Sequence, residues 1–367
     1  MNTQHASSAR SLSRRRFIQA GAATVAAAGL ASTCMARGRR NIKLGFDNFS
    51  IRGMGWKAGQ VIDYAAAQKV DTVLFSDLQV YESHDAGHLR DLRAKAADLG
   101  IEIQAGTYSI CPTSEKVTRD YGTPEEHLAL CIRIATAVGS PVVRCVLGNS
   151  QDRLVEGGIE AQIASTAGVL KQVRSRALEA GIKLAVENHS GDMQAWELVT
   201  LIEEAGREFV AATIDSGNAA FTLEDPLVNL EILAPYVGTT GIRDTAVWET
   251  PEGAAAQWAA MGEGNVDWNV YIDRFALACP GTPLVLEIIS EYGRSFPYLK
   301  PEFWKPFPKV RGHEFARFVA FAKKGKPKAG FEVPAGQDRP QALREFQMAE
   351  LGRSIRYCKE ELGLGLK

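Results

Sequence analysis

The sequence lacks the features that most thiolate-metal, disulfide-rich and membrane-spanning proteins depend on. Its six cysteines form no CxxC pair or other ligand spacing, and five of them follow Cys34, an odd number for a disulfide framework. Histidine is scarce, with six in 367 residues. No apolar run is long enough for a membrane span, and no glycine-rich loop has the pattern that binds phosphates. The cysteines after Cys34 are therefore expected to be buried, inert thiols.

An excess of positive charge is also missing. Lys and Arg number 42 against 43 Asp and Glu, for a net charge of −1. The first 36 residues contain four arginines and no acid, so without them the net charge falls from −1 to −5. An acidic chain of this kind does not favour nucleic acid or an anionic membrane surface as a partner.

The amino-terminal segment has the pattern of an export signal. Ser13-Arg14-Arg15-Arg16-Phe17-Ile18 precedes a small, weakly apolar run over residues 21–31 that is too short to span a bilayer comfortably. This pattern predicts a twin-arginine signal over residues 1–36 and a periplasmic or otherwise exported protein. Anchoring as a lipoprotein at Cys34 is an alternative, although Ala31 is a poor first residue for that cleavage box.

One domain is indicated over residues 41–328, because turn signals are evenly spread there and no linker interrupts them. Strand-like apolar runs alternate with segments of helical period, which favours a (β/α)8 TIM barrel. The strands begin near Ile42, Asp71, Ile101, Pro141, Ile182, Val210, Val237 and Pro283, with helices over residues 61–69, 87–99, 124–138, 159–180, 194–207 and 266–278.

An open, doubly wound sheet would satisfy the same alternation, but three acids separate the two folds. Glu187, Asp215 and Glu287 each come at the end of a predicted strand. Strands lie about 4.8 Å apart, so Glu187 and Glu287 would be roughly 14 Å apart in an open sheet of sequential order. In a barrel, strand ends face a common axis and their side chains can converge. The barrel is therefore favoured.

The same three acids predict a metal site. Glu287 lies inside the apolar run LVLEII and Glu187 follows KLAV, where an unpaired charge is costly to bury. Asp215 precedes a Ser-Gly turn, where an Asp is also a common cap. Carboxylates about 4 Å apart repel by several kcal/mol per pair at an effective dielectric near 20, so protons or a cation must offset that repulsion. Mn²⁺ or Mg²⁺ is expected, and Zn²⁺ or Co²⁺ if His189 also binds.

Further polar residues lie near these acids in the sequence. By the two-residue period of a strand, His189 shares a face with Glu187, which makes it a substrate or metal ligand or a structural hydrogen-bonding residue. Arg144, in the run VVRCV, is either a donor to a substrate oxygen or the ion-pair partner of a site carboxylate. Three tryptophans in predicted loops are candidates to cover the pocket and stack on a bound ring: Trp56, Trp248 and Trp304.

Taken in order, these motifs resemble the xylose isomerase-like TIM barrel superfamily, in its sugar phosphate isomerase and epimerase branch. The resemblance covers roughly residues 41–324, and the superfamily also includes inosose dehydratases and endonuclease IV. The motifs are Val186-Glu187-Asn188-His189, Ile214-Asp215-Ser216-Gly217-Asn218, Ile242-Arg243-Asp244, Met261-Gly262-Glu263-Gly264-Asn265-Val266-Asp267-Trp268 and Leu286-Glu287.

The resemblance implies that Glu187, Asp215 and Glu287 bind a metal ion together with a histidine after the seventh strand. The chain departs from the family at that histidine, because the family pattern His-x-Lys-Asp is replaced here by Gly241-Ile242-Arg243-Asp244. A second family histidine corresponds to Asn218.

These departures leave two alternatives for the metal. Water, Asp244 or His189 completes the metal shell, or the cation binds weakly or not at all. Asn218, Arg243 and Asp244, with His189 and Arg144, are then expected to bind substrate.

The resemblance also implies a reaction, proton removal next to a sugar carbonyl with Glu187 and Glu287 as acid and base and the metal stabilising the enediolate. The expected protein is an exported carbohydrate isomerase or epimerase with a small carbohydrate as partner. A keto-sugar or inosose dehydratase or lyase, and a non-catalytic sugar-binding barrel with a decayed metal site, are alternatives. Endonuclease chemistry is disfavoured, because a multi-metal site needs more histidines and a more basic surface.

The carboxyl-terminal residues 329–367 have a different composition. A Pro-, Gly- and charge-rich stretch leads into a helical pattern over residues 341–361 with one apolar face. We expect this helix to pack on the barrel or on a second copy of the chain, which leaves a homo-oligomer open.

Overall fold

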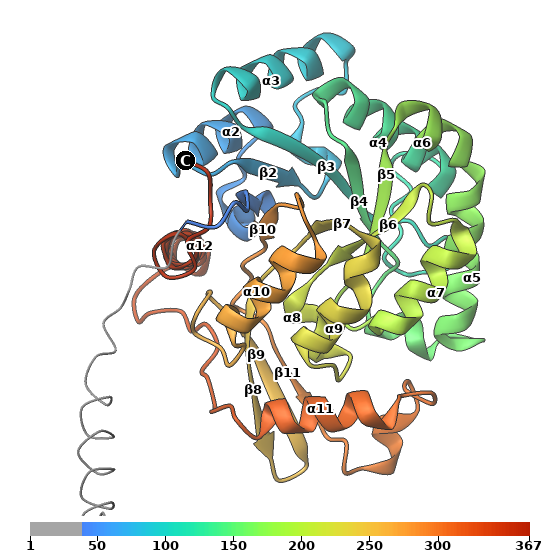
Figure 1. Cartoon of the computed structure of the whole chain (residues 1–367), viewed down its shortest axis with the longest axis vertical. Helices are drawn as coiled ribbons and strands as arrows, with labels where there is room; N and C mark the ends of the chain where they lie inside the picture. Colours follow the sequence, from blue (N-terminus) through green and yellow to red (C-terminus); the bar gives the residue numbers. More distant parts are fainter. Residues whose placement is uncertain (1–38) are drawn as a thin grey trace, which may run out of the picture. The chain divides into compact units, whose positions relative to one another are not determined.

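Eight parallel strands surrounded by helices form the centre of the molecule in the computed structural model, which describes residues 39–367 (Figure 1). The predicted signal at residues 1–36, with Cys34, lies outside the described residues. The strands, each near a predicted run, are β1 (Leu44–Asp47), β2 (Thr72–Phe75), β3 (Glu102–Ser109), β4 (Val142–Val146), β5 (Lys183–Glu187), β6 (Val210–Ile214), β7 (Val237–Thr240) and β10 (Leu284–Leu286).

The sheet closes on itself where β7 approaches β10. The strand order is β10-β1-β2-β3-β4-β5-β6-β7, and Ile242, just after β7, forms a parallel bridge with Leu286. The Ile242 N–H donates to the Val285 carbonyl (2.7 Å), and the Glu287 N–H donates to the Ile242 carbonyl (2.9 Å). The predicted (β/α)8 barrel is therefore confirmed, and the open sheet is excluded.

The surrounding helices begin and end where their capping residues stand. Thr123 and Glu126 form a reciprocal capping box at the start of one helix, and Gly139 ends it in the left-handed conformation. These two caps set the bounds of that helix at residues 124–138. The helices between the barrel strands are α2 (Ala58–Ala67), α3 (Ala86–Asp98), α4 (Pro124–Val138), α5 (Gly158–Gln172), α6 (Arg174–Ala180), α7 (Ala195–Ala205), α8 (Ser216–Phe221), α9 (Pro226–Leu233) and α10 (Trp268–Ala278).

The barrel carries a small antiparallel sheet that the sequence did not predict. It runs β11-β9-β8 and is covered by a helix, and it begins immediately after the site residue Arg243 (Figure 1). A second apolar core, which includes Phe221, Trp258, Phe296 and Phe318, holds it together. Its elements are β8 (Asp244–Thr250), β9 (Gly253–Ala259), β11 (Gly293–Phe296) and α11 (Gly312–Ala322).

The carboxyl-terminal region is helical, as predicted, and it packs on the barrel. Helix α12 (Arg339–Glu360) lies against the 3-10 turn η1 (Asn48–Met54) (Figure 1). Beyond α12, the Gly365 N–H donates to the Ile42 carbonyl (2.9 Å), and the Arg40 N–H donates to the Gly363 carbonyl (2.7 Å). The last residues are thereby joined to the start of β1.

Two further features of residues 39–367 are the state of the cysteines and the apolarity of the helices. The five cysteines after Cys34 are buried and unpaired, as expected for inert thiols. Within residues 39–367, no helix combines the length and apolarity that crossing a membrane requires.

Candidate active site

The three predicted acids meet at the carboxyl end of the barrel. Glu187 ends β5, Asp215 follows β6 and Glu287 follows β10. One oxygen from each lies within 4.8 Å of the others, and all three side chains are buried. Residues separated by 100 positions in the chain are thus brought to one point by the closure of the sheet.

Asp215 is held in place by backbone N–H groups at the start of α8 and by a side chain that follows β5. It is the N-cap of α8, where its Oδ1 accepts from the Gly217 and Asn218 N–H groups (both 2.8 Å). The Asn188 side chain donates to the Asp215 carbonyl (2.8 Å) and accepts from the Asp215 N–H (2.9 Å). The Oδ2 atom of Asp215 lies on the side of the other two acids.

Two buried arginines neutralise the acids. Arg144, from β4, donates to Glu187 Oε2 from Nε (2.6 Å) and Nη2 (2.5 Å). Arg243, which follows β7, places Nη2 between Asp215 Oδ2 and Glu287 Oε2 and pairs with both. The positive charge that three crowded carboxylates need is therefore supplied by side chains of the same chain.

Arg243 fits into this position because two neighbouring residues are glycines. A Cβ at Gly217 would lie 2.3 Å from Arg243 Cγ, so any larger residue would collide with the arginine side chain. A Cβ at Gly241 would lie 3.3 Å from Glu287 Oε2 and 3.6 Å from Asp215 Oδ2, so a side chain there would point into the acids. The guanidinium also stacks on Trp258, with Cζ 4.4 Å from the ring centroid.

Asn218 joins two of the acids. Its amide Nδ2 donates to Glu187 Oε1 (3.0 Å) and to Asp215 Oδ2 (2.7 Å). A hydrogen-bond donor thus stands where the family often has a histidine.

The surroundings shift the pKa values of the acids in different directions. Burial raises the pKa of Glu187 well above its usual range, with Arg144 opposing the rise. Burial acts in the same sense on Glu287, but Arg243 and Arg144 outweigh it and hold the pKa of Glu287 below its usual value. Burial raises the pKa of Asp215 to about 6 against the effect of Arg243. Neighbouring acids whose pKa values are shifted in opposite directions suit the separate roles of acid and base in general acid-base chemistry.

A cavity of about 840 Å³ opens onto this cluster. It is large enough for a small sugar, and it combines aromatic walls with polar groups at its base, as carbohydrate sites commonly do. Side chains that line it are Phe49, Tyr108, Arg144, His189, Asn218, Arg243, Trp258, Glu287, Tyr292 and Arg294.

His189 lies on the cavity wall with one ring nitrogen already engaged. Its Nδ1 is 2.6 Å from the Gly148 carbonyl, which fixes Nδ1 as the protonated nitrogen of the neutral ring. Burial, together with the charge of Arg144, lowers the pKa of His189 to about 4. His189 therefore presents Nε2 as an acceptor near neutral pH.

Not every predicted residue lines the cavity. Of the three acids, Glu287 lines it, whereas Glu187 and Asp215 contact the lining residues Arg144, Asn218 and Arg243. Asp244 is buried, and its Oδ2 accepts from the N–H groups of Gly262 (3.0 Å) and Gly264 (2.9 Å), so it anchors a loop and does not line the cavity. The predicted role of Asp244 in substrate binding is corrected on this ground. The three loop tryptophans also pack elsewhere and do not line the cavity: Trp56, Trp248 and Trp304.

Two residues near the acids were missed by the sequence reasoning. Asp47 ends β1, is buried, and accepts from the Ser76 hydroxyl (2.7 Å), while burial and Glu287 raise its pKa to about 7. Its place after the run IKLGF is the same signal that identified the other acids. Trp258 lies on the unpredicted strand β9, so nothing in the strand pattern could assign it to the site.

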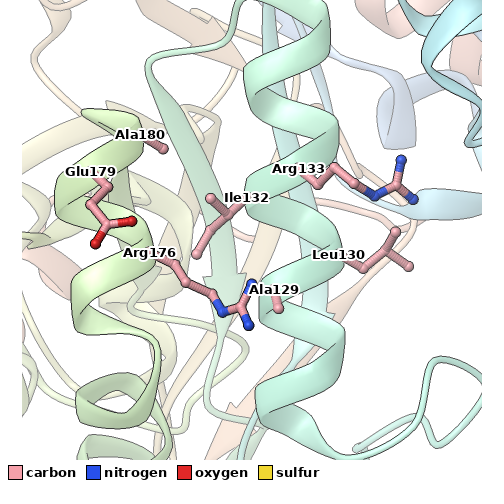
Figure 2. A pocket seen from close by; sticks show the side chains of 7 residues that line it. All are labelled: Ala129, Leu130, Ile132, Arg133, Arg176, Glu179 and Ala180. Atoms are coloured by element: carbon pink, nitrogen blue, oxygen red, sulfur yellow. The ribbon is translucent and has the colours of Figure 1, made fainter.

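A second hollow lies on the outside of the barrel between α4 and α6. Arg176 reaches from α6 toward Ala129, whereas Arg133 points away (Figure 2). Glu179 is the one acid among the residues that line this hollow, so polar groups do not converge there as they do at the barrel mouth.

The family resemblance implies a divalent cation, and the side chains at this position fit such an ion only in part. Three clustered carboxylates are ligands that hard cations prefer, and in this respect the acids fit a metal ion. Arg243 does not fit, because its Nη2 holds the oxygens of Asp215 and Glu287 that the ion would share. Two unit charges 4 Å apart repel by about 4 kcal/mol at an effective dielectric of 20, and a dication beside the guanidinium would feel about twice that.

Comparison with protein families agrees with the geometry. The family model described as "Xylose isomerase-like TIM barrel" matches residues 52–306, more than half of the chain. This chain belongs to the xylose isomerase-like TIM barrel family. No curated protein matches it.

Solved structures of this barrel resemble the chain at low sequence identity. A D-psicose 3-epimerase crystallised with D-fructose is 13% identical, with a TM-score of 0.57 over 88% of this chain and 100% of that one. A xylose isomerase-like protein from Mycobacterium smegmatis in complex with magnesium is 13% identical, with a TM-score of 0.53 over 77% and 97%. A probable 3-DHS dehydratase from Bacillus anthracis is 13% identical, with a TM-score of 0.51 over 67% and 92%. Likeness at this level establishes the shared fold.

Proposed function

We propose that this protein is a carbohydrate isomerase or epimerase that removes a proton from the carbon next to a sugar carbonyl. The observation that carries the proposal is the position of Glu287 on the wall of a sugar-sized cavity, beside Glu187 and two buried arginines. The name of the D-psicose 3-epimerase supports a sugar as the substrate class.

In the proposed reaction, Glu287 is the base. Its carboxylate takes the proton from carbon, and the electron pair of that bond moves into the carbonyl to form an enediolate. The charges of Arg144 and Arg243 stabilise the developing negative oxygen, because preorganised charge is most effective in a site that excludes water. Glu187 returns a proton, either to the opposite face of the same carbon or to its neighbour. The first outcome is epimerisation and the second is isomerisation.

The same enediolate can also expel a hydroxyl group from the next carbon. A keto-sugar or inosose dehydratase is therefore the second candidate function, supported by the dehydratase among the structures with this fold. Both reactions share the steps up to the enediolate. They differ in the next step: an isomerase or epimerase returns a proton to carbon, whereas a dehydratase loses a hydroxyl group, which takes up a proton and leaves as water.

Solvent deuterium exchange tests the proposal. The protein is incubated with a panel of ketoses and keto-sugars in D₂O, and products are analysed by mass spectrometry and NMR. Deuterium on carbon without loss of water indicates an isomerase or epimerase, and loss of one water indicates a dehydratase. Glu287→Gln should lose exchange by at least about a hundredfold. Glu263→Gln, at an exposed residue paired with Lys328 and Arg353, is the matched control. No exchange with any sugar in the panel would favour a sugar-binding barrel.

We also propose that the chain is exported through the twin-arginine pathway, on the basis of Arg14 and Arg15. Replacing both with lysine should keep the protein in the cytoplasm, as measured by cell fractionation. Export of both forms by the same amount would contradict the proposal.

A further inference from the structure

We propose that the guanidinium of Arg243 is the resident cation of this site and takes the place of the divalent metal ion implied by the family resemblance. The protein then carries out its chemistry without a bound metal. This inference rests on the proposed function for its chemistry, but metal binding is measured separately from activity.

The hydrogen bonds of Asp215 leave it no free position for a metal ion. An ionised carboxylate has about four lone-pair directions. In Asp215, Oδ1 accepts from two backbone N–H groups, and Oδ2 accepts from the amide of Asn218 and from Arg243. A cation could therefore bind Asp215 only after one of these donors had left.

Glu187 and Glu287 are also committed to donors. Glu187 Oε2 accepts two N–H groups from Arg144, and its Oε1 accepts from Asn218. Glu287 Oε2 accepts from Arg243. Lone pairs remain on the Oε1 atoms of both residues, so Asp215 sets the limit. A metal ion that needed one oxygen from each acid would have to displace a donor of Asp215, and the bond to Arg243 is a charge-assisted one, among the strongest in proteins.

The space for Arg243 depends on the glycine at residue 241. Gly241 stands at the position of the family histidine, and a side chain there would point at Asp215 and Glu287. With glycine, that volume is open to the guanidinium. Gly217 clears the path of the arginine side chain in the same way, since a Cβ there would overlap with Arg243 Cγ. The absence of a side chain at residue 241 and the position of the Arg243 guanidinium are thus geometrically linked.

An arginine is suited to this position by its shape. Its planar guanidinium bridges two carboxylates through Nη2 while it stacks on the face of Trp258, which a lysine ammonium cannot do equally well. Nε and Nη1 of Arg243 are buried and have no hydrogen-bond acceptor among residues 39–367. Two donor nitrogens of Arg243 are therefore not used by Asp215 or Glu287, and Arg243 lines the substrate cavity.

The first experiment measures metal in the full-length wild-type protein. We expect dialysed protein to contain well under one divalent ion per chain by inductively coupled plasma mass spectrometry. Mn²⁺ and EDTA should leave the melting temperature unchanged. One tightly bound ion per chain that disappears in Glu187→Gln would overturn the proposal.

The second experiment restores the family pattern. The double substitution Gly241→His with Arg243→Lys should create a saturable Mn²⁺ site at least about tenfold tighter than in wild type, by calorimetry and by stabilisation against heat. Arg243→Met, which frees the same oxygens without adding a side chain at residue 241, is the alternative if the double variant does not fold. A folded variant of either kind that binds Mn²⁺ no better than wild type would refute the exchange of metal for arginine.

Arg294→Met is the matched control for the loss of a positive charge. Arg294 lines the same cavity, and no carboxylate lies within ion-pair distance of it in the described chain. This variant should gain no Mn²⁺ affinity. A gain equal to that of Arg243→Met would show that general charge, and not the position of Arg243, controls metal binding, and it would overturn the proposal.

Activity distinguishes a failure of this inference from a failure of the proposed function. Deuterium exchange that persists in EDTA supports both. Exchange that requires Mn²⁺ removes the inference and keeps the function. Metal-free protein that exchanges no sugar removes the function, whereas the gain of Mn²⁺ binding in the Arg243 variants still supports the inference.

Discussion

At the scale of single residues, the site depends on small side chains as much as on charged ones. Arg243 reaches Asp215 and Glu287 only because Gly217 and Gly241 leave room for it. The charged residues could be identified from the sequence, since each follows an apolar run. The clearance at Gly217 could not be identified, because it depends on a contact between the first turn of α8 and the segment after β7, which only the folded barrel brings together.

The clearance at Gly217 gives a test on stability. In Gly217→Ala, the new Cβ would overlap with the Arg243 side chain, so we expect the free energy of unfolding to fall by about 1–3 kcal/mol. Urea denaturation measures the change. Gly168→Ala, in α5 with nothing within 4 Å of the new Cβ, is the control and should stabilise by up to about 1 kcal/mol. A neutral Gly217→Ala would show that the arginine can move aside.

His127 offers a test by pH. It is buried, its Nε2 lies 2.7 Å from the Thr107 hydroxyl, and burial lowers its pKa to about 4. The unfolded chain takes up a proton near pH 6.5, so the stability that the neutral ring contributes is complete above that pH and is lost as the pH falls toward 4.

Relative to His127→Gln, wild type should therefore lose about 1.4 kcal/mol of unfolding free energy per pH unit within that window. Urea denaturation at several pH values measures the slope, and imidazole ¹⁵N shifts report protonation directly. If the ring titrates near 6.5 in the folded protein, the explanation is wrong.

At the scale of elements, the sequence predicted best where local signals were complete. The capping box at Thr123 and the left-handed Gly139 define α4, and the prediction of residues 124–138 matches it. The predicted helix over residues 159–180 is in fact two helices that meet at Val173, where no proline or glycine marks the break. The hairpin of β8 and β9 was missed because its alanine-rich second strand lacks an alternating pattern.

Helix α12 supports the cavity through Gln347. Its Oε1 accepts from the Gly53 N–H (2.9 Å), and its Nε2 donates to Glu291 (2.8 Å), which pairs with Arg52 on the cavity edge. Gln347→Ala should cost about 1–3 kcal/mol of unfolding free energy, because it removes hydrogen bonds to two half-buried groups, one of them a carboxylate. Gln341→Ala, exposed on the same helix, should change stability by less than about 0.5 kcal/mol in the same urea experiment. Equal effects would show that the contacts of Gln347 contribute no more to stability than an exposed side chain does.

At the scale of the whole molecule, the barrel could be predicted because eight strand-like runs and three strand-end acids point to the same closed sheet. The role of Arg243 could not, since the resemblance to the family suggested a missing ligand and gave no sign that a side chain two residues later would occupy the space. The direction of a side chain after β7 depends on the register of β7 with β6 and on the bridge to β10.

The carboxyl-terminal tail provides a test at this scale. Leu362 and Leu364 are buried, and the Leu366 N–H donates to Asp71 (3.0 Å) beside the first two strands. Removing residues 362–367 should lower the free energy of unfolding by at least about 3 kcal/mol. Thermal and urea denaturation of the truncated protein measure the loss. A truncated protein as stable as the full chain would show that the tail only rests on the surface.

The hydrogen bonds of residues 363 and 365 to residues 40 and 42 also constrain when the protein can mature. The segment that leads into the first barrel strand gains these hydrogen bonds only after residue 365 has left the ribosome. Until then, the barrel lacks part of its native contacts.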